Sequence, residues 1–307
     1  MSMKNYLKNL DEKIEEVIDY NKGEFLHIIA SVIIVTYNSN KKVLEQCLNS
    51  LKEQTFKDFE IIIVDNSDKT DLKPIVSKYI CKYIKLKKNY GLSLARNIGI
   101  KFARGDIVIF LDDDAIPAHN FVEEHVSAYS KYDIFGLRGK SLPKTHAIYN
   151  YLAPHYDLGD QPIPYYIDLE GNSSFKRDVL SEIGGFNPEL QGAGGCEGLE
   201  LTYRIISKCK DKSKLIYYPN AVIYHDYSDT FVKYIKKQLR HAKHNNMLKC
   251  IFPDIFEFDR GYKFNSKKLK RETPSLSIRI QLRIIRKLTS FILRVQKLLN
   301  KNLDECS

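Results

Sequence analysis

The stretch GDIVIFLDDDA, residues 105–115, joins a run of apolar residues to three consecutive aspartates. Residues 107–111 are β-branched or large and apolar, a pattern typical of a short strand buried on both faces of a parallel sheet. Charge begins where this strand should end, and open α/β sheets bind ligands outside the carboxyl ends of their strands. Asp112, Asp113 and Asp114 therefore lie where we expect a functional site.

The aspartates suit a divalent cation. Asp112 and Asp114 point to the same side if the backbone stays extended, because side chains alternate along a strand. Two adjacent carboxylates repel each other unless a cation joins them, and Mg²⁺ or Mn²⁺ that also holds phosphate oxygens is the natural partner. The alternative is that the aspartates only cap a helix whose start is indicated by Pro117.

Two more predicted strands end in polar residues. Residues 28–36 form an apolar run followed by Tyr37 and Asn38, and residues 60–64 form another that ends at Asp65. Helical patterns separate these strands, and Asn40 is a good N-cap for the first helix. Strands alternating with helices over roughly 110 residues predict an α/β fold with a doubly wound, mostly parallel sheet. The polar strand ends predict a nucleotide-sized site along one edge of that sheet.

Composition sets further limits. The 307 residues are 43% hydrophobic and 28% charged, as in ordinary folded proteins. The six cysteines form no CxxC pair, which favours a reducing compartment over a disulfide framework. No stretch resembles a signal peptide or approaches the ~20 apolar residues of a membrane span, so we expect a cytoplasmic protein.

The net charge of +10 is unevenly placed. Residues 261–307 hold 12 Lys and Arg against three acids, so the rest of the chain is nearly neutral. A neutral body argues against a nucleic-acid partner. We divide the chain into an N-terminal helical extension (1–26), a body (27–249) and a basic, amphipathic helical tail (250–307).

Both ends of the chain show helical spacing. In the extension the spaced apolar residues are Leu7, Leu10, Ile14, Val17 and Ile18. In the tail, residues 274–301 predict a helix whose apolar stripe is Ile278, Leu282, Ile285, Leu288, Ile292, Val295 and Leu299. Lys and Arg run beside that stripe, so we expect the tail to lie on an anionic membrane surface, peripheral at the inner face of the plasma membrane. The alternative is that the helix packs on the body or on another subunit.

Taken together, the sequence blocks resemble those of a family 2 glycosyltransferase of the GT-A fold. The resemblance covers about residues 28–245, and the order and spacing of the blocks make it specific. The blocks are SVIIVTYN (31–38), EIIIVDNS (60–67), NYGLSLARNIGI (89–100), GDIVIFLDDDA (105–115), FKRDVLSEIGGFNPEL (175–190), EGLEL (197–201) and YHDYS (224–228).

The resemblance implies a nucleotide-sugar donor, a divalent metal (Mn²⁺ or Mg²⁺) and inversion at the anomeric carbon. It places Thr36, Tyr37 and Asn38 in the nucleotide pocket and makes Asp65 an acceptor for the base. An ionised carboxylate takes an imide N–H well, which suits uracil, thymine or guanine and disfavours adenine. Among the corresponding donors we expect UDP first, with GDP or dTDP as alternatives. Without the resemblance, Asp65 would be a turn-forming residue.

The resemblance also assigns the diphosphate and metal residues. Arg96 and Asn97 match positions near the diphosphate and ribose, although Arg96 could equally be an exposed helix residue. Asp112 and Asp114 match the DxD pair, with Asp114 on the metal and Asp112 on ribose or metal, and Asp113 is the variable middle position counted with the donor site. His225 matches a histidine near the metal, which would favour manganese, or it is a structural histidine.

The catalytic base is the weakest match. The family commonly supplies it from an acidic Glu-Asp pair that opens a helix after a glycine-rich loop, but here Glu197 is followed by Gly198. Glu197 becomes the first candidate base and Glu200 the second. The alternatives are that Glu197 is an N-terminal acid that only interacts favourably with the helix dipole, and that Glu200 only forms a surface ion pair with Arg204.

The predicted reaction is transfer of a sugar to a hydroxyl of a glycan or a polyprenyl-linked acceptor. A nucleotidyltransferase on a similar sheet is one alternative, although residues 31–40 lack the glycine-rich phosphate loop that such enzymes usually have. A module that binds the donor without efficient transfer is another, supported by Gly198 alone.

Overall fold

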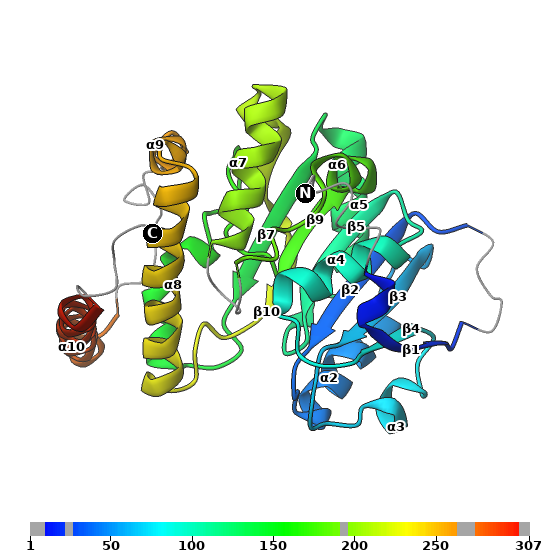
Figure 1. Cartoon of the computed structure of the whole chain (residues 1–307), viewed down its shortest axis with the longest axis horizontal. Coiled ribbons are helices and arrows are strands. Elements are labelled where there is room, and N and C mark those ends of the chain that lie inside the picture. Colours follow the sequence, from blue (N-terminus) through cyan, green and yellow to red (C-terminus); the bar gives the residue numbers. More distant parts are fainter. Residues whose placement is uncertain (1–9, 22–26, 191–195, 263–273, 301–307) are drawn as a thin grey trace.

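The computed structural model describes residues 10–21, 27–190, 196–262 and 274–300. Within them lies a mixed α/β fold built on one ten-stranded sheet with helices on both faces (Figure 1). The strands are β1 (Ile14–Asp19), β2 (Ala30–Thr36), β3 (Phe59–Asp65), β4 (Lys82–Leu86), β5 (Ile107–Asp112), β6 (Ile116–Pro117), β7 (Gly136–Leu142), β8 (Ile163–Pro164), β9 (Asn172–Lys176) and β10 (Leu215–Tyr224). Their order across the sheet is β1-β4-β3-β2-β5-β9-β7-β10-β6, and β8 pairs with β10.

The helices alternate with the strands as the sequence predicts. The α-helices are α2 (Lys41–Lys52), α3 (Lys73–Val76), α4 (Leu92–Phe102), α5 (Phe121–Lys131), α6 (Arg177–Ile183), α7 (Glu197–Cys209), α8 (Phe231–Ile251), α9 (Ile255–Arg260) and α10 (Leu276–Asn300). The 3-10 turns are η2 (Asp11–Lys13), η3 (Ile148–Leu152), η4 (Pro154–Tyr156) and η5 (Lys212–Lys214). Asn40 caps α2 through its side chain, which accepts a hydrogen bond from the Lys42 backbone N–H, as predicted.

Four neighbouring strands of the sheet are parallel. β4, β3, β2 and β5 run in the same direction, and their register pairs Thr36 with Asp65 and Val35 with Asp112. The carboxyl ends of these strands therefore meet at one edge, which confirms the predicted placement of the polar strand ends. Beyond β5 the sheet is mixed, because β9 runs antiparallel to both β5 and β7. The parallel part of the predicted sheet thus consists of these four strands and of a second parallel pair, β7 and β10.

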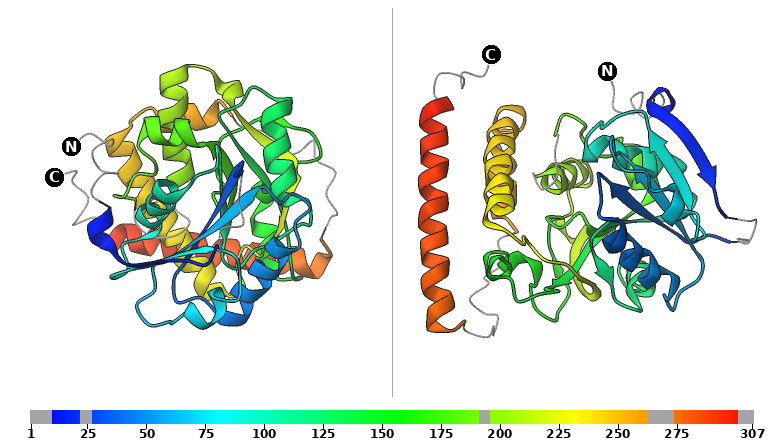
Figure 2. Two further views of the ribbon diagram at one scale, coloured as in Figure 1. Left: turned by 90° about the vertical axis from the view of Figure 1, so that its right-hand side faces the viewer. Right: turned by 90° about the horizontal axis from the view of Figure 1, so that it is seen from below.

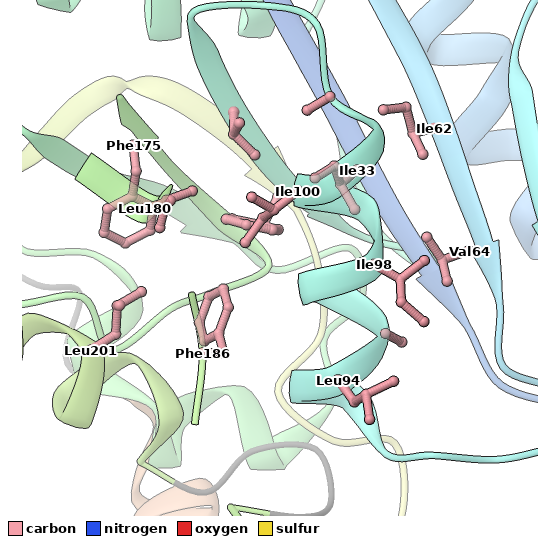
Figure 3. Close-up of a cluster of buried hydrophobic side chains, with 14 of the residues drawn as sticks. Ile33, Ile62, Val64, Leu94, Ile98, Ile100, Phe175, Leu180, Phe186 and Leu201 are labelled. Atoms are coloured by element: carbon pink, nitrogen blue, oxygen red, sulfur yellow. The ribbon is translucent and has the colours of Figure 1, made fainter. Parts of the chain in front are cut away.

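The parallel strands are buried on both faces. Ile33 of β2 belongs to the apolar cluster under α4, α6 and α7, whereas its neighbours Val32 and Ile34 belong to the cluster on the other face, with α2 and α5. Figure 3 shows α4 lying between the β2 and β3 side chains and Phe186. Packing on both faces fixes the position of each strand end, because a shift of the strand register by one residue would move every core side chain to the opposite face of the sheet.

The N-terminal prediction is wrong where it can be compared. Residues 14–19 form strand β1, antiparallel to β4, where we expected a helix; Leu7 lies outside the described residues. Side-chain exposure alternates along β1, so the apolar residues also fit period two. A short isolated helix is only marginally stable in water, whereas pairing with the edge of β4 satisfies the backbone of residues 14–19 within the sheet, and this tertiary context decides the outcome.

The tail helix has two apolar faces. α10 lies outside α8, which lies beside the body (Figure 2). Ile278, Leu282, Ile285 and Ile292 of the predicted stripe are at least half-buried on the side of α8 and η3, which matches the alternative that the helix packs on the body. The helix also has a second apolar face, which is exposed and includes Leu288 and Val295 of the predicted stripe. The other residues of this exposed face are Leu276, Ile280, Ile284, Phe291 and Leu298.

Candidate functional site

A cleft of about 2330 Å³ opens between the strand ends and α8. Tyr37 and Asn38 after β2 and Arg96 on α4 line it on the sheet side. The three aspartates after β5 and His225 after β10 complete that side. The cleft thus brings together seven of the site residues predicted from sequence, Asp113 among them. Its volume is larger than the ~300–1,000 Å³ of typical small-ligand sites.

Asp112, Asp114 and His225 form a candidate metal centre. One ligand atom from each lies within 4.8 Å of the others, and His225 Nε2 is 3.1 Å from an Asp114 carboxylate oxygen. The second ring nitrogen of His225 is buried and has no hydrogen-bond partner among the described residues. Two carboxylates and an imidazole are a donor set that suits Mn²⁺, so the residues present fit the metal implied by the resemblance.

The ionisable side chains at this edge of the sheet have shifted pKa values. Burial raises the pKa of Asp112, against the opposing effect of His225 and Arg96. Burial and the charge of Asp114 raise the pKa of Asp113 to about 7, although Ser39 donates a hydrogen bond to it. Burial works against ionised His225, but the hydrogen bond and charge of Asp114 outweigh it and raise the pKa of His225. A divalent ion would relieve this repulsion among the carboxylates.

Arg96 is placed to hold an anion. It is only 4% exposed, so it is not the exposed helix residue of the alternative interpretation. Its guanidinium lies 5.2 Å from the centre of the Phe186 ring, and Nη2 is 3.9 Å from Asp112 Oδ1. Nη1 is buried without a hydrogen-bond partner in the part of the chain that the structure describes. A buried, unsatisfied guanidinium N–H at the wall of a cleft points to an anionic ligand.

Three predicted donor-site residues lie behind the cleft wall. Asp65 is fully buried, and Tyr83 OH, the Ser67 backbone N–H and Thr36 Oγ1 donate hydrogen bonds to its carboxylate at 2.6, 2.9 and 3.3 Å. Asn97 is fully buried and bonds the backbone of Phe186 through both ends of its amide. Contact between Asp65 and a nucleotide base stays a prediction, since a base would have to replace one of these donors.

The two candidate bases do not line the cleft in the described residues. Both carboxylate oxygens of Glu200 accept hydrogen bonds from Arg204, at 2.7 and 2.8 Å, so the pair predicted as the alternative exists, but it is buried. Glu197 is 1% exposed. Neither glutamate therefore offers a free carboxylate to the cleft.

Sequence reasoning missed several cleft residues. Glu170, in the loop before β9, lines the cleft although its sequence context gave no signal of a role. Lys144 reaches the site from another loop and donates to the Asp114 carbonyl at 2.7 Å. Nor did the sequence predict that α8 forms the opposite wall of the cleft. The basic residues of α8 that line it are Lys233, Lys236, Lys237, Arg240, His241 and Lys243.

The family of the chain follows from a comparison with known families. Residues 31–184 match the family described as Glycosyl transferase family 2. The central sheet with helices on both faces matches solved glycosyltransferase structures of the GT-A fold. The chain belongs to glycosyl transferase family 2 and is a glycosyltransferase.

Curated relatives match about half of this chain. The poly(ribitol-phosphate) beta-N-acetylglucosaminyltransferase TarS of Staphylococcus aureus is 34% identical over 173 residues, which are 52% of this chain and 29% of that protein. The poly(ribitol-phosphate) beta-glucosyltransferase of Bacillus spizizenii is 30% identical over 167 residues, 50% of this chain and 26% of that protein. The chain thus spans less than a third of the length of these relatives.

Solved structures show the same fold. A mannosyltransferase from Pyrobaculum calidifontis, in complex with GDP-Man and Mn²⁺, aligns with a TM-score of 0.60 and 18% identity over 99% of this chain and 94% of that one. Residues 1–349 of S. aureus TarS align with a TM-score of 0.51 and 19% identity over 78% and 77%. These identities support the shared fold alone.

Proposed function

We propose that the protein is an inverting, metal-dependent glycosyltransferase that moves a sugar from a nucleoside diphosphate, UDP first, to a hydroxyl of its acceptor. The carrying observation is the convergence of Asp112, Asp114 and His225 beside the unsatisfied N–H of Arg96. A cation and a diphosphate together would satisfy all four groups. The neighbouring structures with GDP-Man and Mn²⁺, or with UDP and Mn²⁺, support this assignment by analogy of fold.

Each residue has a defined part in donor binding. Asp112, Asp114 and His225 would hold Mn²⁺ or Mg²⁺, which when bound neutralises charge on the departing diphosphate. Arg96 donates to a phosphate oxygen, and Tyr37 and Asn38 lie where the nucleoside enters. Thr36, Asp65 and Asn97 hold the strand ends and the 185–186 turn in place.

The acceptor carries phosphate groups. Lys236, Arg240 and Lys243 recur every three or four residues on one face of α8, and they form no ion pair with residues that the structure describes. Nε of Arg240 is buried without a hydrogen-bond partner among those residues. Two curated relatives act on poly(ribitol-phosphate) by their names, which supports a phosphodiester chain or a polyprenyl-linked phosphate as the acceptor here.

The tail holds the enzyme at an anionic membrane surface. The exposed apolar face of α10 is flanked by Arg279, Arg283, Lys287 and Arg294, and residues 276–300 contain no acid. Two copies of this face would repel each other, whereas anionic headgroups would attract it. A helix of this kind lies in the interface plane and does not cross the bilayer. None of the helices in the described residues is long and apolar enough to span a membrane.

A thermal-shift screen tests the donor assignment. UDP-, GDP- and dTDP-sugars are added with and without Mn²⁺, to the natural protein, to Asp114→Ala and to the matched control Asp106→Ala outside the cleft. A ligand at about 100 times its Kd stabilises the fold by about 2.7 kcal/mol. We expect a metal-dependent shift with one nucleotide, kept in Asp106→Ala and lost in Asp114→Ala. No shift with any donor would sink the proposal, and release of pyrophosphate instead of nucleoside diphosphate would indicate a nucleotidyltransferase.

A further inference from the structure

The start of α7 has no room for a side chain at position 198. A Cβ on Gly198 would lie 2.2 Å from the carbonyl oxygen of Ile167 and 2.7 Å from Oε1 of Glu170. The backbone contact cannot relax by a side-chain rotation, so the close approach of the loop before β9 requires glycine. The missing acid of the Glu-Asp pair is therefore a consequence of how this loop packs on the helix.

Glu170 fills the space that an acid at 198 would take. Its Oε1 accepts a hydrogen bond from the Gly198 backbone N–H at 2.6 Å. The other carboxylate oxygen accepts no hydrogen bond from the residues that the structure describes, and the side chain lines the cleft. A carboxylate thus remains at the opening of α7, although it comes from a different segment of the chain.

The same loop is tied to the metal edge. The next residue, Gly171, accepts a hydrogen bond from the Asp112 backbone N–H at 3.2 Å. A Cβ on Gly171 would lie 2.0 Å from the Asp112 carboxylate carbon, so the backbone rests directly on that side chain. Glu170 is consequently held between α7 and Asp112, close to where a donor diphosphate would lie.

We infer that Glu170 is the general base of the transfer, in place of the acid that the family carries at position 198. This inference rests on the proposed function. The Glu170 carboxylate takes the proton of the acceptor hydroxyl while its oxygen forms a bond to the anomeric carbon. The bond from that carbon to the diphosphate oxygen breaks, and its electron pair leaves with the nucleoside diphosphate. The proton on Glu170 then passes to water.

The alternative explanation is that Glu170 only caps the first turn of α7. Glu170→Gln separates the two roles, because the amide oxygen still accepts the Gly198 N–H but the amide cannot take a proton. Water serves as the probe acceptor: metal-dependent release of nucleoside diphosphate from the donor is measured without any other acceptor. Donor Kd and Tm are measured on the same samples.

We expect Glu170→Gln to lower the release rate by about 10²–10⁴-fold, with donor Kd and Tm unchanged. Glu53→Gln, the same substitution at an exposed acid outside the cleft, should keep the natural rate. A natural rate in Glu170→Gln would overturn the inference. So would a lower Tm together with a rise in donor Kd by the same factor as the fall in rate. So would the loss appearing in Glu197→Gln instead. If the natural protein binds no nucleotide sugar, the proposed function has failed and not the base assignment.

Discussion

The two walls of the cleft are built in opposite ways. On the sheet side, Asp112 and Asp114 lie at the end of β5 and His225 lies at the end of β10, and the strand pairing of the sheet fixes their positions. On the opposite side, the cations come from a single helix that contacts the body less than the sheet contacts itself. The sheet side is thus organised before any ligand binds. On the α8 side, Lys236, Arg240 and Lys243 form no ion pair within the described residues, so a bound anion would organise them. We expect the first to recognise the donor and the second to recognise the acceptor.

Replacing Arg96 should give the largest effect on the sheet side. Arg96→Met keeps the contact with Phe186 but removes the donors, and hydrogen bonds to charged groups are worth about 1.5–3 kcal/mol. We expect donor Kd, measured by calorimetry with Mn²⁺, to rise by up to about 100-fold. Arg177→Met, which loses an exposed pair with Asp106, is the control. Equal affinity in Arg96→Met and the natural protein would show that the donor does not reach this arginine.

The difference between the walls also explains what the sequence could predict. The sheet edge was predictable because continuous apolar runs, buried on both faces of the sheet, end in polar residues, as at Leu111 and Asp112, and parallel strands bring such ends together. The site residue Glu170 was not, because its role depends on a loop that meets Gly198, 28 positions away, through packing alone. The helix expected for residues 14–18 failed for a similar reason, since the edge of β4 decides their structure.

The exposed face of α10 should give an intermediate effect. Ile284→Ser with Phe291→Ser removes two apolar side chains that would enter the interface, each contributing ~1 kcal/mol, below the value of full burial. Binding to vesicles of phosphatidylglycerol and phosphatidylcholine, followed by co-sedimentation, should weaken by roughly 30-fold. Val17→Ser with Ile80→Ser, at 43% and 45% exposure, is the matched control at exposed apolar positions outside α10. If the natural protein does not sediment with these vesicles, α10 has another partner.

The α8 wall should give the smallest effect, because its cations act additively and in contact with water. Lys236→Gln, Arg240→Gln and Lys243→Gln together should weaken binding of a fluorescent glycerol-phosphate oligomer about tenfold, if each contributes ~0.5 kcal/mol. Lys41→Gln, Lys52→Gln and Lys57→Gln remove the same charge from exposed positions outside the cleft and should have little effect.

Donor affinity measured on the same α8 variant tests the division between the two walls. If donor and oligomer affinities fall together, the α8 cations hold the donor diphosphate, and the comparison drawn above is wrong. If a single-stranded RNA of equal length binds as tightly as the oligomer, the wall attracts any polyanion. Only a loss confined to the phosphodiester probe, with binding that weakens as salt is added, assigns this wall to the acceptor.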